Sequence, residues 1–371
     1  PLRNRPLIAH LAYSQYIHMA PEKEAAMLDL ADLLLDAGAD PNDGVPSEPG
    51  PEHRLSMLYG ALGHANNLAL AERLLERGAT PDDNESLYHA TELPTADGLR
   101  LLIRYNVRIS GTNALPRALD FDDAEKVRLL LEAGANPNEA VQAHPSGQPI
   151  DTIPALHQAA RRWCSAEVVR TLLKHGADPA PAWMGLSAYE TARVFGNDAA
   201  AAVLEASGHS HALSPDIDLL AACVDGTPPK RRLERERLPQ ELQRLPVEIA
   251  GRPGRLAHLQ ALILAGLDPN QTNDMGLTPL HVAAWEGVAE HVRYFLTLSP
   301  DLAHKNAYGG DALGTAIHGA EFSPHRAERD HIACAALLLA AGAALDPRQA
   351  AATGNEAMAL FLSEQRGESV G

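Results

Sequence analysis

The residues that could do chemistry together are a few histidines and one cysteine near the C-terminus. His331 and Cys334 are three residues apart, so they would share one face of a helix, and His318 could approach them across a hairpin. Imidazole and thiolate are ligands that zinc prefers. However, no close Cys–Cys or His–His pair anchors this set, and Cys334 also fits a buried helix position. We therefore predict no metal site, and keep a zinc or enzymatic site in this C-terminal segment as the alternative.

Familiar catalytic motifs are absent. The sequence contains no GxSxG, HExxH, P-loop or GxGxxG motif. His157 and His281 stand in similar surroundings, LHQAA and LHVAA, and catalysis by either would need a base and a nucleophile close by. We predict that both histidines are structural. The chain is therefore predicted not to be an enzyme, with no catalytic residue and no cofactor.

A second chemical possibility is nucleic-acid or membrane-surface binding by the run KRRLERER, residues 230–237. The run mixes both charge signs at helical spacing, which is typical of an exposed, solvated helix, and no aromatic residues are interleaved to stack on bases. The chain carries 48 acidic and 31 basic residues, a formal net charge of −17, so it would repel a phosphate backbone. We predict no nucleic-acid partner, with an adaptor role for this run as the alternative.

The elements that would position these residues are clearest between Gly276 and Asn306. Thr278 is a helix N-cap, and Pro279 takes the first helical position, where its missing N–H costs nothing. Gly287 allows a reversal, and apolar residues at helical spacing then form the buried stripe of a second helix. A hairpin this short cannot bury both of its apolar faces alone, so it needs similar hairpins on either side.

Similar hairpins recur along the chain. The pattern LLxxGAxPN, which ends the second helix, is found with some drift at 34–42, 74–82, 130–138, 172–180, 262–270 and 338–346. Gly266 and its counterpart Ser299 are 33 residues apart. Asn106, a residue type that tolerates a left-handed conformation, takes the Gly place in a drifted third unit. Together with TPLHVAA and the Gly that follows it, these motifs resemble the ankyrin repeat.

The resemblance covers nearly the whole chain and implies an all-α fold. The expected architecture is an ankyrin-repeat solenoid of about ten helix-turn-helix repeats with β-turn fingers. We predict about six repeats in residues 1–209, and about four with a C-terminal cap in residues 210–371, the two blocks being continuous. Loop insertions are expected at 139–153 and 319–331.

The resemblance also implies a function. Ankyrin repeats bind proteins through a concave groove and the fingers, and they share no catalytic activity. Positions near the end of each first helix point into that groove, and an exposed Trp there favours a partner, although Trp285 could instead pack on its neighbours and cover the seam. The predicted function is a non-catalytic interaction module or scaffold whose protein partner has a basic surface, because the chain is acidic. The predicted partner-binding residues are Phe121, Arg161, Arg162, Phe195, Trp285, Glu286, Tyr308 and His318.

Cysteine usage and hydropathy bear on the compartment. The three cysteines lie far apart inside predicted helices, which favours a reducing compartment over a disulfide framework. The most apolar run, residues 332–345, is too short to span a membrane. The stretch from LLAAC to YGGDALGTAIHG resembles a recurring group of bacterial ankyrin proteins, which implies a bacterial source. We therefore predict a bacterial cytoplasmic protein without membrane insertion, with delivery into a host cell as the alternative.

Overall fold

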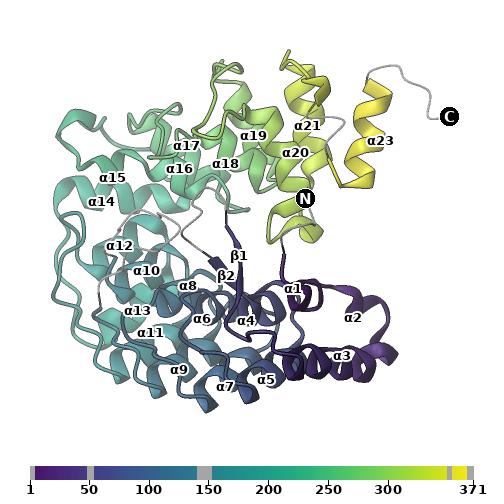
Figure 1. The fold of residues 1–371 in the computed structure, drawn as a ribbon. Coiled ribbons are helices and arrows are strands. Elements are labelled where there is room, and N and C mark those ends of the chain that lie inside the picture. The colour runs from purple at the N-terminus through teal and green to yellow at the C-terminus, as the bar shows by residue number, and fades with distance from the viewer. Residues whose placement is uncertain (1–4, 48–53, 140–152, 349–352, 366–371) are drawn as a thin grey trace. The chain divides into compact units, whose positions relative to one another are not determined.

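The computed structural model describes residues 5–47, 54–139, 153–348 and 353–365 (Figure 1). It divides into two compact units, and each is described by itself. Unit 1 is residues 1–192 with 197–211, and unit 2 is residues 193–196 with 212–371. The predicted division at 209/210 into continuous blocks stays a prediction, because compactness alone does not distinguish separate domains from one stack.

Unit 1 is a series of short helices with one small hairpin of strands. In chain order they are α1 (Leu7–Ala12), α2 (Tyr16–Met19), η2 (Pro21–Lys23), α3 (Glu24–Asp36), β1 (Gly44–Pro46), β2 (Arg54–Ser56), α4 (Met57–Tyr59), the π-helical turn η3 (Gly60–His64), α5 (Leu68–Glu76), α6 (Ser86–Ala90), α7 (Asp97–Arg104), α8 (Ala114–Asp120), α9 (Ala124–Glu132), α10 (Ala155–Arg161), α11 (Ala166–Lys174), α12 (Ala188–Phe195), whose last three residues belong to unit 2, and α13 (Asp198–Ala206).

Among the described residues of unit 2, every regular element is an α-helix or a 3-10 turn. The unit contains α14 (Pro215–Ala222), η4 (Cys223–Asp225), η5 (Arg235–Arg237), α15 (Gln240–Gln243), α16 (Leu245–Ile249), α17 (Leu256–Leu264), α18 (Pro279–Trp285), α19 (Ala289–Leu296), α20 (Ala312–Phe322), η6 (Arg326–Glu328), α21 (His331–Ala340) and α23 (Glu356–Gln365). The all-α ankyrin-like fold class is confirmed. Among the described residues, no helix is both long and apolar enough to cross a bilayer.

The helices stack as two parallel layers within each unit. In unit 1, α8 packs between α6 and α10, while α9 packs between α7 and α11. In unit 2, α18 packs between α16 and α20, while α19 packs between α17 and α21. First helices therefore contact first helices, and second helices contact second helices. Each hairpin buries its two apolar stripes against its neighbours rather than in a core of its own.

The hairpin formed by α18 and α19 follows the sequence rules closely. The Thr278 hydroxyl caps α18 by accepting a hydrogen bond from the backbone N–H of His281, and Pro279 is the first helical residue. Leu280 is buried on α18, and Phe295 is buried on α19. Both helices begin and end close to where the sequence predicts.

Left-handed backbone positions end the second helices. The φ angle is positive at Gly38, Gly78, Asn106, Gly134 and Gly176 in unit 1 and at Gly266, Ser299 and Gly342 in unit 2. The prediction that Asn106 replaces a Gly is confirmed, since its φ is 57°. Trp163 likewise takes the place of the reversal Gly, with φ 55°.

Two expectations about loops need correction, and a third lies mostly outside the described residues. The run 230–237 is not one helix, because only Arg235–Arg237 forms a 3-10 turn and the Leu233 N–H bonds to the Ala265 carbonyl at 2.8 Å. The insertion predicted at 319–331 is shorter, since α20 continues to Phe322. The insertion predicted at 139–153 lies mostly outside the described residues.

The left-handed positions give a direct stability test. We expect Ser299→Gly to stabilise the fold by about 0.5–1 kcal/mol, because Gly adopts φ 55° without the Cβ clash of an L residue. Gly342→Ser should destabilise by about 1 kcal/mol, since φ is 97° there and a Cβ would meet no atom within 4 Å, which isolates the backbone cost. Urea denaturation measures the free energy of unfolding of both variants, provided that their m-values are unchanged. If both substitutions changed that free energy in the same direction, the assignment of a left-handed backbone to both positions would be contradicted.

Candidate functional site

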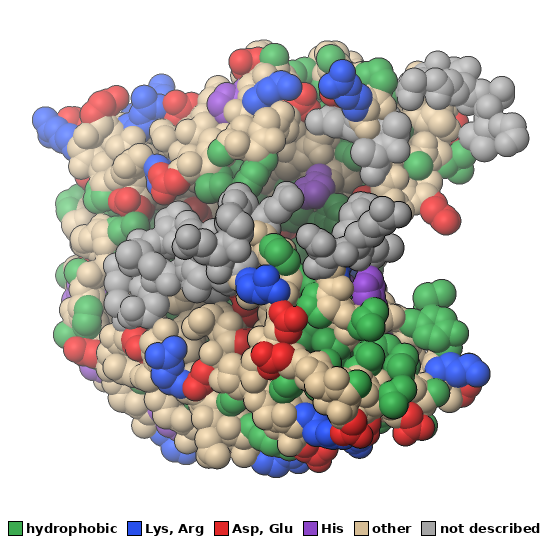
Figure 2. Space-filling model, viewed as in Figure 1, with side chains coloured by type: hydrophobic (Ala, Val, Ile, Leu, Met, Phe, Trp, Pro, Cys, Tyr) green, Lys and Arg blue, Asp and Glu red, His purple; other side chains and the backbone are tan. Residues whose placement is uncertain are grey.

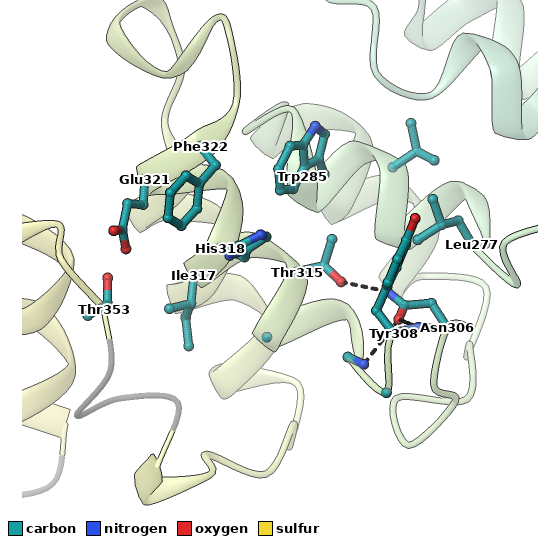
Figure 3. A pocket seen from close by; sticks show the side chains of 14 residues that line it. Leu277, Trp285, Asn306, Tyr308, Thr315, Ile317, His318, Glu321, Phe322 and Thr353 are labelled. Carbon is teal, nitrogen blue, oxygen red and sulfur yellow. Dashed lines mark hydrogen bonds between the residues drawn. The ribbon is translucent and has the colours of Figure 1, made fainter. Parts of the chain in front are cut away.

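A cleft in unit 2 combines exposed aromatic rings with few charges. It has a volume of about 750 Å³ and is formed by α18, α20 and the loop between α19 and α20. In Figure 3, Tyr308 lies on one side of the cleft, Phe322 and Glu321 lie on the other, and Trp285 and His318 lie between them. The fourteen lining residues are Leu277, Val282, Trp285, Asn306, Tyr308, Gly309, Gly310, Gly314, Thr315, Ile317, His318, Glu321, Phe322 and Thr353.

Asn306 shapes the loop that presents Tyr308. Its side-chain Oδ1 accepts hydrogen bonds from the backbone N–H groups of Tyr308 at 2.9 Å and Gly310 at 3.1 Å. The N–H of Ala307 bonds to the Met275 carbonyl at 2.9 Å, which ties this loop to the preceding one. The Tyr308 side chain is left 78% exposed at the edge of the cleft.

The rings of Trp285, His318 and Phe322 form a row. The ring centroids of Trp285 and His318 are 5.4 Å apart, and those of His318 and Phe322 are 4.5 Å apart. His318 and Phe322 are four residues apart on α20 and so share one helix face. Trp285 is therefore half-buried against His318, as the seam-packing alternative expected, yet it still lines the cleft.

The sequence prediction included Trp285, Glu286, Tyr308 and His318 in unit 2 but missed Phe322. Treating residues after His318 as an insertion hid the i, i+4 relation that places Phe322 beside His318. Glu286 lies next to Trp285 rather than in the cleft lining, and its carboxylate accepts from His325 Nδ1 at 3.2 Å.

The residues proposed for zinc are used otherwise. The Nε2–H of His331 donates to the carbonyl of Trp285 at 2.8 Å, while His318 is stacked between Trp285 and Phe322. Cys334 is buried, and burial raises the pKa of its thiol to about 12, which disfavours the thiolate. Across the described ranges, no group of three or more potential ligands is assembled for a metal.

Unit 1 carries a charged network on its first helices. The Arg117 guanidinium pairs with Glu92 at 2.7 Å and with Asp120 at 3.0 Å. The same guanidinium lies over the rings of Tyr88, at 5.5 Å, and Phe121, at 4.8 Å. Arg117 is thus held by two carboxylates and two rings, all from its own chain.

Three predicted groove residues adjoin this network. Phe121 is 36% exposed, and the Arg117 guanidinium lies over its ring. Arg162 Nε pairs with Asp120 at 2.9 Å. Arg161 lies over the Trp183 ring at 5.6 Å. Phe121 and Arg162 thus lie beside Arg117 and Asp120, whereas Arg161 contacts Trp183, and both arginines are already engaged inside the chain.

Phe195 does not lie on an open surface. Its side chain is only 4% exposed, so the expectation that it faces a groove is wrong for this conformation. The backbone beside it is covered, because Gly196 is in close contact with Val224 and its carbonyl accepts from Arg255 Nη2 at 2.9 Å. An aromatic ring at this position adds to the core of unit 2.

The basic run is largely neutralised within the chain. Arg231 pairs with Asp216, Arg235 pairs with Asp268 at 2.8 Å, and Arg237 pairs with Glu234 at 2.7 Å. These pairs reduce the positive charge that a phosphate would meet.

His89 extends the network of unit 1 toward Glu85. Its Nδ1 lies 2.8 Å from a Glu92 oxygen, and its Nε2 lies 3.4 Å from a Glu85 oxygen. Burial lowers the pKa of His89, but hydrogen bonds to Glu85 and Glu92 outweigh it and raise the pKa to about 9. His89 is therefore a cation at neutral pH.

Several other histidines are buried and neutral. His157 Nε2 donates to the Leu186 carbonyl at 2.9 Å, and His281 Nδ1 lies 2.7 Å from the Thr278 hydroxyl oxygen, so both have the structural contacts that the sequence predicts. His258 differs, because neither ring nitrogen has a hydrogen-bond partner among the described residues and the side chain is 1% exposed. Burial and the nearby Arg255 charge lower the pKa of His258 to about 3.

Comparisons with known proteins find the ankyrin repeat in part of this chain. The family model for the ankyrin repeat matches residues 153–181 and 275–307. Over 74 residues the chain is 45% identical to mouse (Mus musculus) ankyrin repeat and SOCS box protein 16, and this match covers 20% of the chain and 16% of the mouse protein.

Solved structures similar to this chain include two ankyrin repeat domains. One, from Acinetobacter baumannii AYE, is 23% identical with a TM-score of 0.41, and the match covers 52% of this chain and 97% of that domain. The other is the ankyrin repeat domain of Bcl-3, 21% identical with a TM-score of 0.27, over 64% of this chain and 93% of that domain.

The His89 network predicts that the stability of unit 1 falls as the pH becomes alkaline. Because the folded pKa of about 9 lies above the unfolded value of about 6.5, the contribution of His89 is complete below pH 6.5 and is lost as pH rises through 9. We expect His89→Gln to cost up to about 3 kcal/mol near pH 6 and to flatten the alkaline slope. Urea denaturation across pH, followed in unit 1 by 19F signals of labelled Trp163 and Trp183, measures this. The exposed His209→Gln is the control, and an unchanged slope in His89→Gln would contradict the prediction.

Buried His258 should have the opposite effect in unit 2, where it lowers the stability as the pH becomes acidic. Its folded pKa of about 3 lies below the unfolded value of about 6.5, so its presence lowers stability as pH falls below 6.5. His258→Leu should therefore gain about 2 kcal/mol relative to wild type at pH 5, on top of about 1 kcal/mol at neutral pH from removing unsatisfied nitrogens. Denaturation followed by the Trp285 signal tests this, and an equal gain at both pH values would disprove the titration.

Proposed function

This chain is an ankyrin repeat protein, and from that premise we propose that it binds another protein through the cleft lined by Trp285, Tyr308, His318 and Phe322. Ankyrin repeats are typically protein-binding modules and generally not catalytic. We propose no reaction and no cofactor for this chain. The partner's identity does not follow from the fold.

The observation that carries the proposal is the exposure of large rings around a concave surface. Tyr308 is 78% exposed and Phe322 is 53% exposed, and both line the same cleft as Trp285. Aromatic side chains left in water around a pocket are typical of binding sites, since a partner that covers them removes apolar area from water. Rings are also effective anchors, because they lose little conformational entropy on binding.

The Trp285 backbone supports a prearranged site. Its carbonyl accepts from His331, and Gly319 lies so close to that carbonyl that an added Cβ would be 2.3 Å from the oxygen. The end of α18 is therefore fixed against α20 and α21. A side chain whose backbone is held in this way has less freedom to lose when a partner binds.

A second surface is proposed in unit 1, around Phe121 and Arg162. Phe121 is partly exposed, and Arg162 is exposed while pairing with Asp120. A partner there would meet alternating charges rather than an apolar cleft. We regard this face as a contributor to specificity.

A cytoplasmic location in a bacterium is also part of the proposal. The three cysteines, Cys164, Cys223 and Cys334, are all buried free thiols, which suits a reducing compartment.

The proposal is tested by photocrosslinking in an extract of the native cell. A benzoylphenylalanine in place of Tyr308 is expected to crosslink a specific protein, whereas the same group in place of Leu264, which is 62% exposed on α17, should not. Adding Trp285→Ala should reduce the crosslinked product about tenfold, as for an aromatic anchor. Mass spectrometry identifies the product.

Two further outcomes are decisive. The same products from positions 308 and 264 would show non-specific contact and reject the cleft. Loss of the product in Arg162→Glu but not in Trp285→Ala would move the binding surface to unit 1.

A further inference from the structure

We propose that the cleft receives an arginine side chain of the protein partner. This assignment rests on the proposed function, because it names the group that the cleft would hold. It is built on three observations: the rings, the charges and a comparison between corresponding positions of the two units.

Three ring systems border the cleft from different segments. Trp285 ends α18, Tyr308 lies in the loop before α20, and Phe322 ends α20 (Figure 3). A guanidinium is attracted to the faces of such rings, most strongly to Trp, and its plane stacks on them. Apolar side chains would also fit rings, so the charges around the cleft must decide between the two.

The charges favour a cation. Of the fourteen described residues that line the cleft, none is Lys or Arg, and Glu321 is the carboxylate. One Glu321 oxygen accepts from the Gly354 N–H at 2.7 Å, which fixes the carboxylate and leaves its other oxygen to accept from a ligand. The chain as a whole has 48 acidic and 31 basic residues, so the surrounding field also attracts a cation.

Corresponding helix positions show what the cleft lacks. Arg117 is the fourth residue of α8, and its guanidinium occupies a site made of two rings and two carboxylates. The fourth residues of α18 and α20 are Val282 and Thr315, and both line the cleft. Where unit 1 supplies its own guanidinium, unit 2 has short side chains.

The seventh positions, counted from the start of the same first helices, also differ between the units: they are carboxylates in unit 1 and rings in unit 2. In unit 1 they are Asp120, the last residue of α8, and Glu92, the seventh residue counted from the start of α6 and two residues past its end, and both pair with Arg117. In unit 2 they are Trp285 and His318, which form the ring row. Unit 2 thus presents rings and a carboxylate around a space that its own side chains leave unfilled, and an arginine from a partner has the size and charge to fill it.

An exposed apolar patch on unit 1 provides a comparison with the cleft. Exposed apolar side chains also gather over α1–α3, as Figure 2 shows, and include Leu7, Tyr16, Met19, Leu30 and Leu33. Of these five described residues only Tyr16 has an aromatic ring, so they do not offer the set of rings found in the cleft. The unit 2 cleft is therefore the surface for which we can propose a specific side chain of the partner.

The test uses the full chain labelled with 5-fluorotryptophan and three short peptides. The peptides have the sequence Gly-Ser-X-Gly-Ser-X-Gly-Ser, with X as arginine, its neutral isostere citrulline, or norleucine. The 19F signal of Trp285 is assigned by its loss in Trp285→Phe. We expect the arginine peptide to shift this signal and to bind about threefold to thirtyfold more tightly than the citrulline peptide.

Variants locate the site. Tyr308→Leu and Phe322→Leu, which keep an apolar side chain, should each weaken the arginine peptide about threefold and leave the citrulline peptide unchanged. Val282→Arg should fill the cleft with an internal guanidinium and abolish binding, whereas Val282→Met should not. Tyr16→Leu is the matched control, since Tyr16 is 50% exposed in unit 1.

Each other result overturns the inference in a different way. Equal affinity for all three peptides at Trp285 would reject the arginine but leave the cleft as an apolar binding surface. Equal shifts of Trp163, Trp183 and Trp285 that no variant changes would indicate diffuse attraction to the acidic chain. No shift of Trp285 by any peptide would reject the arginine assignment, while the crosslink at position 308 would still decide the proposed function.

Discussion

The fold depends on hydrogen bonds that one hairpin donates to the end of the preceding first helix. A short helix leaves its last carbonyls without internal partners, and these must be satisfied when the stack buries them. In unit 1, Lys126 Nζ donates to the Leu93 carbonyl at 2.6 Å, and Asn197 Nδ2 donates to the Ala159 carbonyl at 3.2 Å. In unit 2, His291 Nδ1 donates to Ala250, His331 Nε2 to Trp285 and Asn355 Nδ2 to Ala320, at 2.7, 2.8 and 2.9 Å. Different residue types serve the same purpose, so sequence drift between repeats does not disrupt the stacking.

The same hydrogen bonds connect stability to the candidate site. His331 reads in sequence as a metal ligand, yet its imidazole holds the carbonyl of Trp285, the residue at the centre of the ring row. Gly319 permits this, because any side chain there would collide with that carbonyl. The conformation of the cleft is therefore set by packing between α18, α20 and α21, not by the exposed rings themselves. A binding surface built on such fixed helix ends resembles other sites in which rigid elements present the contact residues.

Much of the fold follows from the sequence, while the site follows only in part. Turn residues, caps and periodic apolar positions are local, so the α18–α19 hairpin and the left-handed Asn106 could be predicted. The pairing of Arg117 with Glu92 and Tyr88 joins residues of successive hairpins, whose alignment depends on the stack. His89 instead pairs with glutamates four residues before it and three residues after it, so that pairing is local. Phe195 shows the same limit, since it occupies a groove position by sequence but is covered by packing specific to its place in the chain. Phe322 was missed because the end of α20 could not be located without its tertiary contacts.

The acidic residues of this chain outnumber the basic residues that could neutralise them. Arginines are fewer than carboxylates, and many are already paired: Arg117 with Glu92, Arg162 with Asp120, and Arg235 with Asp268. Carboxylates therefore exceed the cations available to neutralise them, and a net charge of −17 is exposed to any partner. Long-range attraction of this kind speeds the approach of a basic surface but does not choose a docking position. Under the proposed function, short-range contacts in unit 2 would make that choice, because the cleft combines rings with the fixed Glu321, much as two rings and two carboxylates hold Arg117 in unit 1. The two effects act at different distances, so a single arginine at the right place on a basic partner would benefit from both.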